Sequence, residues 1–246
     1  MTAPLVITSR RNEQVVAAAR LHQSAERRTS QLTLIEGSRL IDEAISAGAH
    51  LASIFGLAGT IPLMIDDQVS AYEVTEPVLE RISGTKSPSG PIAVMSVPPD
   101  GALEKVPTVV LCGIADPGNA GTLIRTAGAF GYQVAVIAGT VDVWSPKVLR
   151  AAAGGHFHTH ITRVQDSPID ALHATGLTSV ALVTEGGLPV GTPFDGIAAL
   201  LVGSEADGLP QELVSAAVHR MTIPMVGATE SLNAAVAGAI AMERLR

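Results

Sequence analysis

The sequence predicts an α/β protein in which a parallel-sheet domain follows a smaller α/β domain. Downstream of residue 107, short apolar segments alternate with stretches of helical spacing. Their hydrophobicity is continuous rather than alternating, which is typical of strands covered on both faces. Pro, Gly and Ser are densest between Gly84 and Lys105, which indicates a boundary. We therefore place a first domain at residues 1–98, a linker at 99–106 and a second domain at 107–246.

The first domain combines predicted helices and strands. Apolar residues at intervals of three and four predict helices over 12–22, 38–48 and 76–83. Short apolar runs predict strands over 32–35, 51–56, 61–65 and 92–97.

The second domain carries five apolar segments that predict strands. They are Thr108 to Cys112, Val134 to Ala138, Ser179 to Val183, Ala199 to Val202 and Met221 to Ile223. Polar, glycine-rich stretches follow four of them: "ADPGNAG", "TEGG", "GSEADG" and "PMVGATESLN". Because ligands bind beyond the carboxyl ends of strands in open parallel sheets, we expect these stretches to form one site.

Composition limits the classes of protein. The chain has 246 residues, 47% of them hydrophobic, and a formal net charge of −7, which argues against a surface that binds polyanions everywhere. Cys112 is the single cysteine, so no internal disulfide forms, and we interpret it as a core residue. We find no targeting signal and no apolar run of about 20 residues. A soluble, cytoplasmic protein without a membrane association is expected.

The stretch "DPGNAGTLIRTAGAFG" predicts a helix from Ala120 to Phe130, capped by Asn119. Its apolar stripe faces the core. Gly121, Arg125 and Gly128 share the other face, so either another helix packs tightly there or a ligand approaches beside an arginine. The glycine spacing fits neither G-x-G-x-x-G nor a P-loop.

Three stretches in this order resemble the signature motifs of the SpoU/TrmH group of SPOUT RNA ribose methyltransferases. They are "DPGNAGTLIRTAGAFG", "GSEADGLP" and "IPMVGATESLNAAVAGAI", and "SPKVLRAAAGGHF" matches the segment between the first two. The resemblance covers residues 107–245. The first half, with "LTLIEGSRLIDEAISAG", is similar to the L30e-like substrate-binding domain that often precedes this catalytic domain.

The resemblance implies a trefoil-knotted SPOUT domain, an obligate homodimer, S-adenosylmethionine as methyl donor, and a ribose 2′-hydroxyl of RNA as acceptor. No metal is implied. The donor would lie against Thr184, Gly203, Glu205, Ile223, Met225, Leu232 and Asn233. The catalytic residues implied are Arg125, Asn119, Glu205, Asn233 and Ser231. This chain departs from the family at one point of the third motif. The family commonly has S-L-N-V-S there, whereas Ala234 and Ala235 follow Asn233 in this chain.

Arg125 is expected to act as a clamp. A guanidinium has a pKa above about 12 and is a poor base. We therefore expect Arg125 to grip an RNA phosphate bidentately and to stabilise the developing alkoxide. The expected RNA-binding residues are Arg10, Arg11, Arg27, Arg28, Lys147 and Arg150, the last two after a Ser145 cap and a Pro146 helix start.

Several alternatives stay open at this stage. His156, His158 and His160 have a period of two and on a strand would face one way, but no further ligand completes a zinc tetrad. The acceptor is expected in 23S rRNA, with tRNA as the alternative. The rival functions are a catalytically silent RNA-binding relative and a nicotinamide-dependent oxidoreductase, which the absent dinucleotide fingerprint disfavours.

Overall fold

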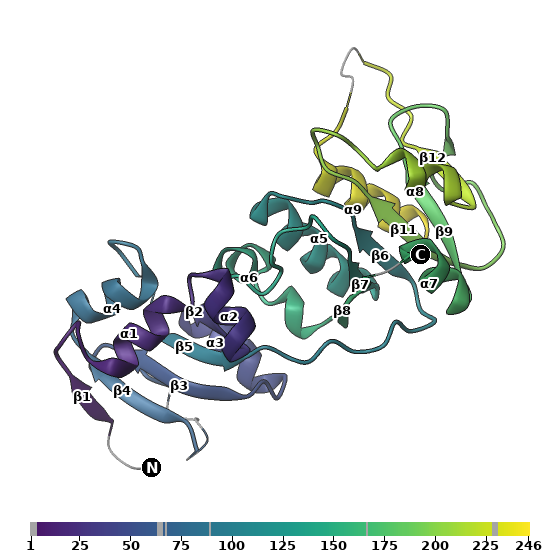
Figure 1. Ribbon diagram of the computed structural model, residues 1–246. Coiled ribbons are helices and arrows are strands. Elements are labelled where there is room, and N and C mark those ends of the chain that lie inside the picture. Colours follow the sequence, from purple (N-terminus) through teal and green to yellow (C-terminus); the bar gives the residue numbers. More distant parts are fainter. Residues whose placement is uncertain (1–3, 63–65, 67, 89, 166, 228–230) are drawn as a thin grey trace. The chain divides into compact units, whose positions relative to one another are not determined.

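A computed structural model describes residues 4–246 apart from 63–65, 67, 89, 166 and 228–230. The chain divides into two compact units (Figure 1), which are described separately below. The N-terminal unit comprises Met1–Pro99 together with Trp144–Arg150, and the C-terminal unit comprises Asp100–Val143 together with Ala151–Arg246. The assignment of residues 144–150 to the N-terminal unit was not anticipated from the sequence.

The N-terminal unit is built on a five-stranded mixed sheet with the order β1-β4-β3-β5-β2. The strands are β1 (Leu5–Ile7), β2 (Leu32–Glu36), β3 (Leu51–Gly56), β4 (Ser70–Val74) and β5 (Ile92–Ser96). The helices are α1 (Glu13–Arg20), α2 (Ser24–Ser30), α3 (Ser38–Ser46) and α4 (Glu76–Ser83). Side chains of α1 and α4 pack with those of the sheet around the buried Phe55.

Most elements expected in this unit are present, with four differences. The predicted strand over 61–65 is not described at 63–65, and Ile61 and Pro62 are not part of a strand. Strand β4 was missed because its sequence, SAYEV, has few apolar residues, and β1 was missed because it has only three residues. Helix α2 escaped prediction since SAERRTS carries no apolar stripe.

The C-terminal unit contains a seven-stranded, entirely parallel sheet with the order β10-β12-β9-β11-β6-β7-β8. Its strands are β6 (Thr108–Leu111), β7 (Gln133–Val136), β8 (Ile161–Arg163), β9 (Leu177–Leu182), β10 (Leu188–Pro189), β11 (Ile197–Val202) and β12 (His219–Thr222). Nearly every residue of β6, β7 and β11 is buried. The predicted parallel α/β sheet is confirmed, and only the short β8 and β10 were not expected.

Helices accompany this sheet along the chain. They are α5 (Pro117–Phe130), α6 (Pro146–Ala152), the 3-10 turn η1 (Gly155–Phe157), α7 (Pro168–Ala174), α8 (Gln211–Ala216) and α9 (Ala234–Arg244). Helix α6 begins as predicted at Pro146, with the Ser145 hydroxyl accepting from the backbone N–H of Val148 at 3.4 Å. No helix among the described residues is long and apolar enough to cross a bilayer.

The glycine face of α5 packs against the same chain. A Cβ placed on Gly121 would lie 2.5 Å from the Ala151 Cβ and 2.7 Å from the Ala152 nitrogen. One placed on Gly128 would lie 3.3 Å from the Gly155 carbonyl oxygen. The first of the two readings of this face, tight packing, therefore holds, and Arg125 is left exposed on it.

Helix α9 packs on α5 through small residues. A Cβ on Gly238 would lie 2.4 Å from a methyl carbon of Leu123, so a larger residue there would require the Leu123 side chain to move. The Tyr132 hydroxyl fixes the end of α9 by donating to the Met242 carbonyl at 3.1 Å. Because the small face is the buried one, Val236 remains 48% exposed.

Candidate active site

A cavity of about 580 Å³ lies at the carboxyl ends of β9, β11 and β12. Parallel strands present the loops after their carboxyl ends at one edge of the sheet, and the predicted meeting of these loops is confirmed. Six of the seven residues expected against the donor line the cavity, namely Thr184, Gly203, Glu205, Ile223, Met225 and Leu232. Ser231 lines it as well, whereas Asn233 does not belong to the lining.

Gly203 is required by the loop that follows β11. The chain turns back on itself there, with Ser204 and Gly208 exchanging backbone hydrogen bonds of 3.2 and 3.0 Å. A Cβ on Gly203 would come within 2.3 Å of the Gly208 carbonyl carbon. The glycine thus allows the loop to close over its own start.

Three polar side chains from three different loops form one cluster beside this cavity. The Asn119 side-chain amide donates to the Glu205 carboxylate. The Asn233 amide donates to the same carboxylate oxygen at 3.0 Å and to the Asn119 oxygen at 3.0 Å. The carboxylate therefore accepts two hydrogen bonds, which fixes it between the two amides.

The side chain of Asn119 can join this cluster because another residue caps the N-terminus of α5. Asp116, not Asn119, is the N-cap, and its carboxylate accepts from the Asn119 backbone N–H at 2.8 Å. Pro117 occupies the first turn, where its missing N–H costs nothing. The predicted Asn119 cap is wrong because the helix begins three residues earlier than expected.

Charge in the cavity favours a cationic ligand. Three carboxylates line it, those of Glu185, Glu205 and Asp207, against one guanidinium, that of Arg220. Sequence reasoning did not select Asp207 or Arg220 as site residues. The position of Arg220 two residues before the end of a strand carries no motif, and only the strand order, with β12 beside β9, brings it to the cavity.

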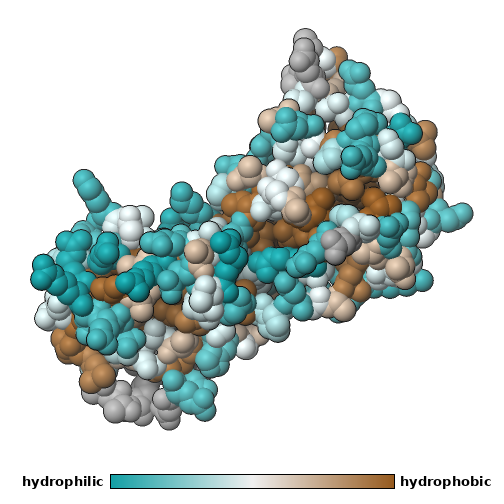
Figure 2. All heavy atoms as spheres, in the orientation of Figure 1, coloured by the Kyte–Doolittle hydropathy of each residue, from teal (hydrophilic) through white to brown (hydrophobic). Residues whose placement is uncertain are grey.

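Arg125 lies elsewhere in the C-terminal unit. It lines a groove of about 680 Å³ between α5 and α9, together with Thr122, Phe130, Ile240 and other residues, and it is not part of the cavity lining. Within one chain, this guanidinium and the cavity expected to hold the donor therefore belong to separate linings. Figure 2 shows apolar surface (brown) in the region where Figure 1 draws α5 and α9.

The expected RNA-binding residues fall into two groups within the N-terminal unit. Arg10, Arg11, Arg28 and Lys147 are exposed. Arg27 is only 5% exposed, and its guanidinium donates to the Leu21 carbonyl at 2.7 Å. This burial gives Arg27 a structural role and removes it from the surface available to RNA.

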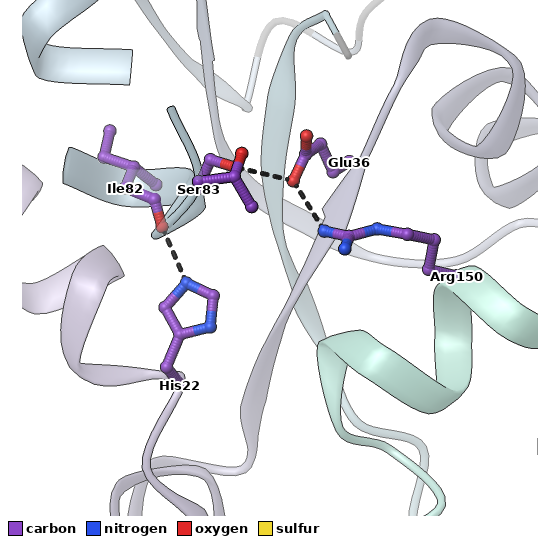
Figure 3. A network of polar contacts seen from close by, with 6 residues as sticks. His22, Glu36, Ile82, Ser83 and Arg150 are labelled. Carbon is purple, nitrogen blue, oxygen red and sulfur yellow. Dashed lines mark hydrogen bonds and ion pairs between the residues drawn. The ribbon is translucent and has the colours of Figure 1, made fainter. Parts of the chain in front are cut away.

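Arg150 takes part in a polar network of the N-terminal unit (Figure 3). Its guanidinium lies 2.9 Å from a carboxylate oxygen of Glu36, and the buried Ser83 hydroxyl donates to the same oxygen at 2.9 Å. Nearby, His22 Nε2 lies 2.8 Å from the Ile82 carbonyl oxygen. Because the Arg150 side chain is half exposed, its charge is shared between Glu36 and solvent.

The three histidines do not share one face of a strand. His156 belongs to η1 and hydrogen-bonds the Val143 carbonyl at 2.8 Å, whereas the His160 ring lies 3.1 Å from the Ala102 carbonyl. No group of three or more potential metal ligands occurs within the described part of the chain. Burial lowers the pKa of His156 to about 4 and raises that of the Cys112 thiol to about 12, so both are neutral core groups at pH 7.

Comparison with known proteins identifies both halves of the sequence. Residues 107–243 match the SpoU rRNA Methylase family, and residues 12–93 match the MRM3-like substrate binding domain. A Bacillus subtilis 23S rRNA (guanosine(2553)-2′-O)-methyltransferase is 32% identical over 98% of both chains. A Streptomyces laurentii 23S rRNA (adenosine(1067)-2′-O)-methyltransferase is 29% identical over 86% of this chain and 84% of its own.

Solved structures agree with these sequence relationships. An AdoMet-bound rRNA methyltransferase from Sinorhizobium meliloti superposes with a TM-score of 0.86 and 28% identity, over 98% of this chain and 97% of its own. An RNA methyltransferase of the TrmH family from Porphyromonas gingivalis has the same TM-score and identity, over 96% and 97%. Both domains thus have counterparts of the same fold, and the expected SPOUT class is confirmed.

Proposed function

The chain belongs to the SpoU rRNA methylase family, and on this premise we propose that it methylates a ribose 2′-hydroxyl of 23S rRNA with S-adenosylmethionine as donor. The single observation that carries the proposal is the cavity at the carboxyl edge of the parallel sheet, lined by residues of two family motifs and bordered by the Asn119–Glu205–Asn233 cluster. Two relatives that match most of this chain are named as 23S rRNA methyltransferases, which favours this acceptor over tRNA.

The cavity suits the donor in size and charge. Pockets for ligands of this size measure about 300 to 1,000 Å³, and 580 Å³ lies within that range. Three lining carboxylates against one guanidinium complement a sulfonium cation. When bound, S-adenosylmethionine supplies an activated methyl group.

The side chains of this chain have the task of alignment. Placing two reacting groups correctly is worth roughly 7 to 11 kcal/mol of barrier. Asn119 and Asn233 are locked by Glu205, and we assign them to orienting the nucleotide, with Ser231 at the cavity wall. Asn233 also caps α9 by accepting from the backbone N–H groups of Ala235 and Val236, so its amide is fixed from both ends.

We propose that the protein acts as a homodimer whose copies cover each other's groove between α5 and α9. Val236 is 48% exposed, and Ile240 and Phe130 line the groove, so an apolar surface is available for a second copy. Arg125 lines this groove, which supports our assignment of the phosphate clamp to the junction of two copies. A Val236→Asp variant is expected to sediment as a monomer, and Leu188→Asp, on an exposed apolar residue elsewhere, as a dimer.

RNA would be held by exposed cations of the N-terminal unit. We assign this role to Arg10, Arg11, Arg28 and Lys147, with Arg150 contributing part of its charge. Recognition by phosphate contacts makes the affinity salt-dependent. Replacing Arg10 and Arg11 by Glu should weaken RNA binding and flatten its dependence on salt. We place the activity in the cytoplasm, where the thiol of Cys112 stays reduced.

Two measurements test the proposed function. Titration calorimetry with S-adenosylhomocysteine should show one site per chain, and the absence of binding would end the proposal. A ribose-methylation map of RNA from a strain lacking the protein should lose one 2′-O-methyl group in 23S rRNA. Wild-type protein should restore it and Arg125→Ala should not. Loss of a tRNA mark instead would change the substrate, and an unchanged map would leave a silent RNA-binding relative.

A further inference from the structure

Arg220 is the single cation among the described residues that line the donor cavity. We propose that its guanidinium binds the carboxylate of the methionine part of the donor. This inference rests on the proposed function and adds a residue that fixes which end of the ligand lies at β12.

The position of Arg220 follows from strand alternation. Its neighbour Met221 is fully buried, so Arg220 projects from the opposite face of β12. There it shares the cavity wall with Gln211 and Val214 of α8. A rigid strand thus presents the guanidinium, because β12 pairs with β9 at Arg220 and Ala181.

The loop after β9 lies directly against this strand. A Cβ on Gly187 would be 2.9 Å from the carbonyl carbon of Arg220 and 2.7 Å from that of Met221. The Gly187 N–H also donates to the Thr222 hydroxyl at 3.1 Å. These contacts hold the preceding residues, Thr184 to Gly186, on the cavity wall that Arg220 also lines.

The guanidinium is available to a ligand. Arg220 is exposed, and no carboxylate oxygen of the other described residues lies within 4.0 Å of its guanidinium nitrogens. Arg150, Arg163, Arg244 and Arg246 by contrast each lie within that distance of a carboxylate. An arginine in a ligand cavity that is not committed to a protein carboxylate is suited to an anionic group of the ligand.

The chemistry of the donor leaves one partner for Arg220. S-adenosylmethionine carries a sulfonium and an ammonium, both cationic, and one carboxylate. The carboxylate is therefore the only charged group of the donor that attracts a guanidinium, and its two oxygens match the fork of arginine. The carboxylates of Glu185 and Asp207 in the same lining have the opposite sign and suit the two cationic groups.

The test compares two ligands and several variants by titration calorimetry. S-adenosylhomocysteine retains the amino-acid carboxylate, and 5′-methylthioadenosine lacks the whole amino-acid end. Arg220→Gln should weaken S-adenosylhomocysteine about 3- to 10-fold, as expected for a solvent-accessible charged pair, and leave 5′-methylthioadenosine within about twofold. Arg220→Lys should bind S-adenosylhomocysteine with an affinity between those of the wild type and Arg220→Gln. Arg163→Gln, which removes an arginine outside the cavity, should change neither ligand.

Other results would overturn the inference. An equal loss for both ligands would mean that Arg220 only shapes the cavity. Unchanged binding of S-adenosylhomocysteine, together with weaker binding of an RNA oligonucleotide, would assign the guanidinium to an RNA phosphate. If wild-type protein binds neither nucleoside, the proposed function itself fails. If wild-type protein binds both ligands but Arg220→Gln has no selective effect on S-adenosylhomocysteine, only the role of Arg220 is overturned and the proposed function stands.

Discussion

The side-chain amide of Asn233 donates to the amide oxygen of Asn119 at 3.0 Å, although 114 residues separate them in the sequence. The same nitrogen lies 3.0 Å from the Glu205 carboxylate, and the Asn233 oxygen accepts from the first free N–H groups of α9. One amide thus joins the start of α5, the loop after β11 and the start of α9. A displacement of any one of these three segments would therefore shift the other two.

Replacing Glu205 by Gln should lower kcat/KM by up to about 100-fold. Both asparagine amides donate to one carboxylate oxygen. The amide oxygen of a glutamine is neutral and a weaker acceptor than the carboxylate, so both hydrogen bonds weaken and the asparagine amides move from their positions. Misplacement by about 1 Å costs about 100-fold in rate. The measurement is single-turnover methylation of an rRNA fragment, with thermal unfolding as a check on the fold.

Glu212→Gln is the matched control, because Glu212 is an exposed carboxylate on α8 that is not among the residues lining the cavity. Its methylation rate should equal that of the wild type. If Glu205→Gln also kept the wild-type rate, the cluster would have no part in alignment.

The two glycines on the Arg125 face of α5 should respond differently to alanine. Alanine raises helix propensity by about 1 kcal/mol over glycine, yet the Cβ at position 121 would lie 2.5 Å from the Ala151 Cβ. Overpacking costs about 1 to 3 kcal/mol, so Gly121→Ala should lower the free energy of unfolding. Gly128→Ala, with its nearest contacts at 3.3 Å, should cost less. Urea titration of both variants would show whether this order holds.

The parallel sheet and the location of the site could be predicted because they depend on local patterns. Continuous apolar runs are visible in β6, β7 and β11, and the loops that follow the strands carry the glycine-rich motifs. The strand order, which brings β12 beside β9, depends on long-range packing. That is why Arg220 was not selected in advance, whereas Asp207 lies in the GSEADG stretch that was expected at the site.

The faces of α5 and α9 show a second limit of sequence reasoning. The periodicity of α5 correctly predicted four of the five residues of its buried stripe, Ala120, Leu123, Ile124 and Ala127. The fifth, Phe130, is partly exposed and lines the groove between α5 and α9. In α9 small residues such as Ala234, Gly238 and Ala241 are buried, whereas the larger Val236 is 48% exposed. Spacing defines two faces of a helix, and the neighbour, here Leu123 against Gly238, decides which one is covered.

Stability should fall on acidification because of His156. Burial lowers the pKa of this ring from 6.5 to about 4, so between those values the unfolded chain takes up a proton that the folded chain does not bind. The contribution of the neutral His156 ring to the free energy of unfolding is fully present above about pH 6.5 and is lost as the pH decreases toward about 4. At pH 5 the loss amounts to about 2 kcal/mol.

The check on this prediction is urea unfolding at about pH 7.5, 6 and 5, one value above the window of about 4 to 6.5 and two within it. His156→Gln should be less stable at pH 7.5 but should lose less stability on acidification than the wild type. His50→Gln, at an exposed histidine, should follow the wild-type curve. Parallel curves for all three proteins would contradict the proposed origin of the pH dependence.

Arg125 provides a test of whether the active site is shared between copies. It lines the groove between α5 and α9, whereas Gly203 lines the donor cavity, and the two linings have no described residue in common. In a homodimer that combines the arginine of one copy with the cavity of the other, Arg125→Ala and Gly203→Val chains would each be inactive alone. Mixed and allowed to exchange subunits, they would form hybrid dimers with one intact site each.

Such a mixture should recover roughly a quarter of the wild-type rate per chain, because about half of the dimers are hybrids and each hybrid has one of its two sites intact. Two variants of the same element, Arg125→Ala and Asn119→Ala, serve as the control mixture. If both residues of a site come from the same copy, each site of a hybrid carries one defect and this mixture stays inactive. If they come from different copies, one site of each hybrid is intact, as in the first mixture. Mass spectrometry would verify that subunits have exchanged. If the Arg125→Ala and Gly203→Val mixture then recovers no activity, Arg125 and the donor must act within the same chain. In that case α5 would have to move toward the cavity when RNA binds.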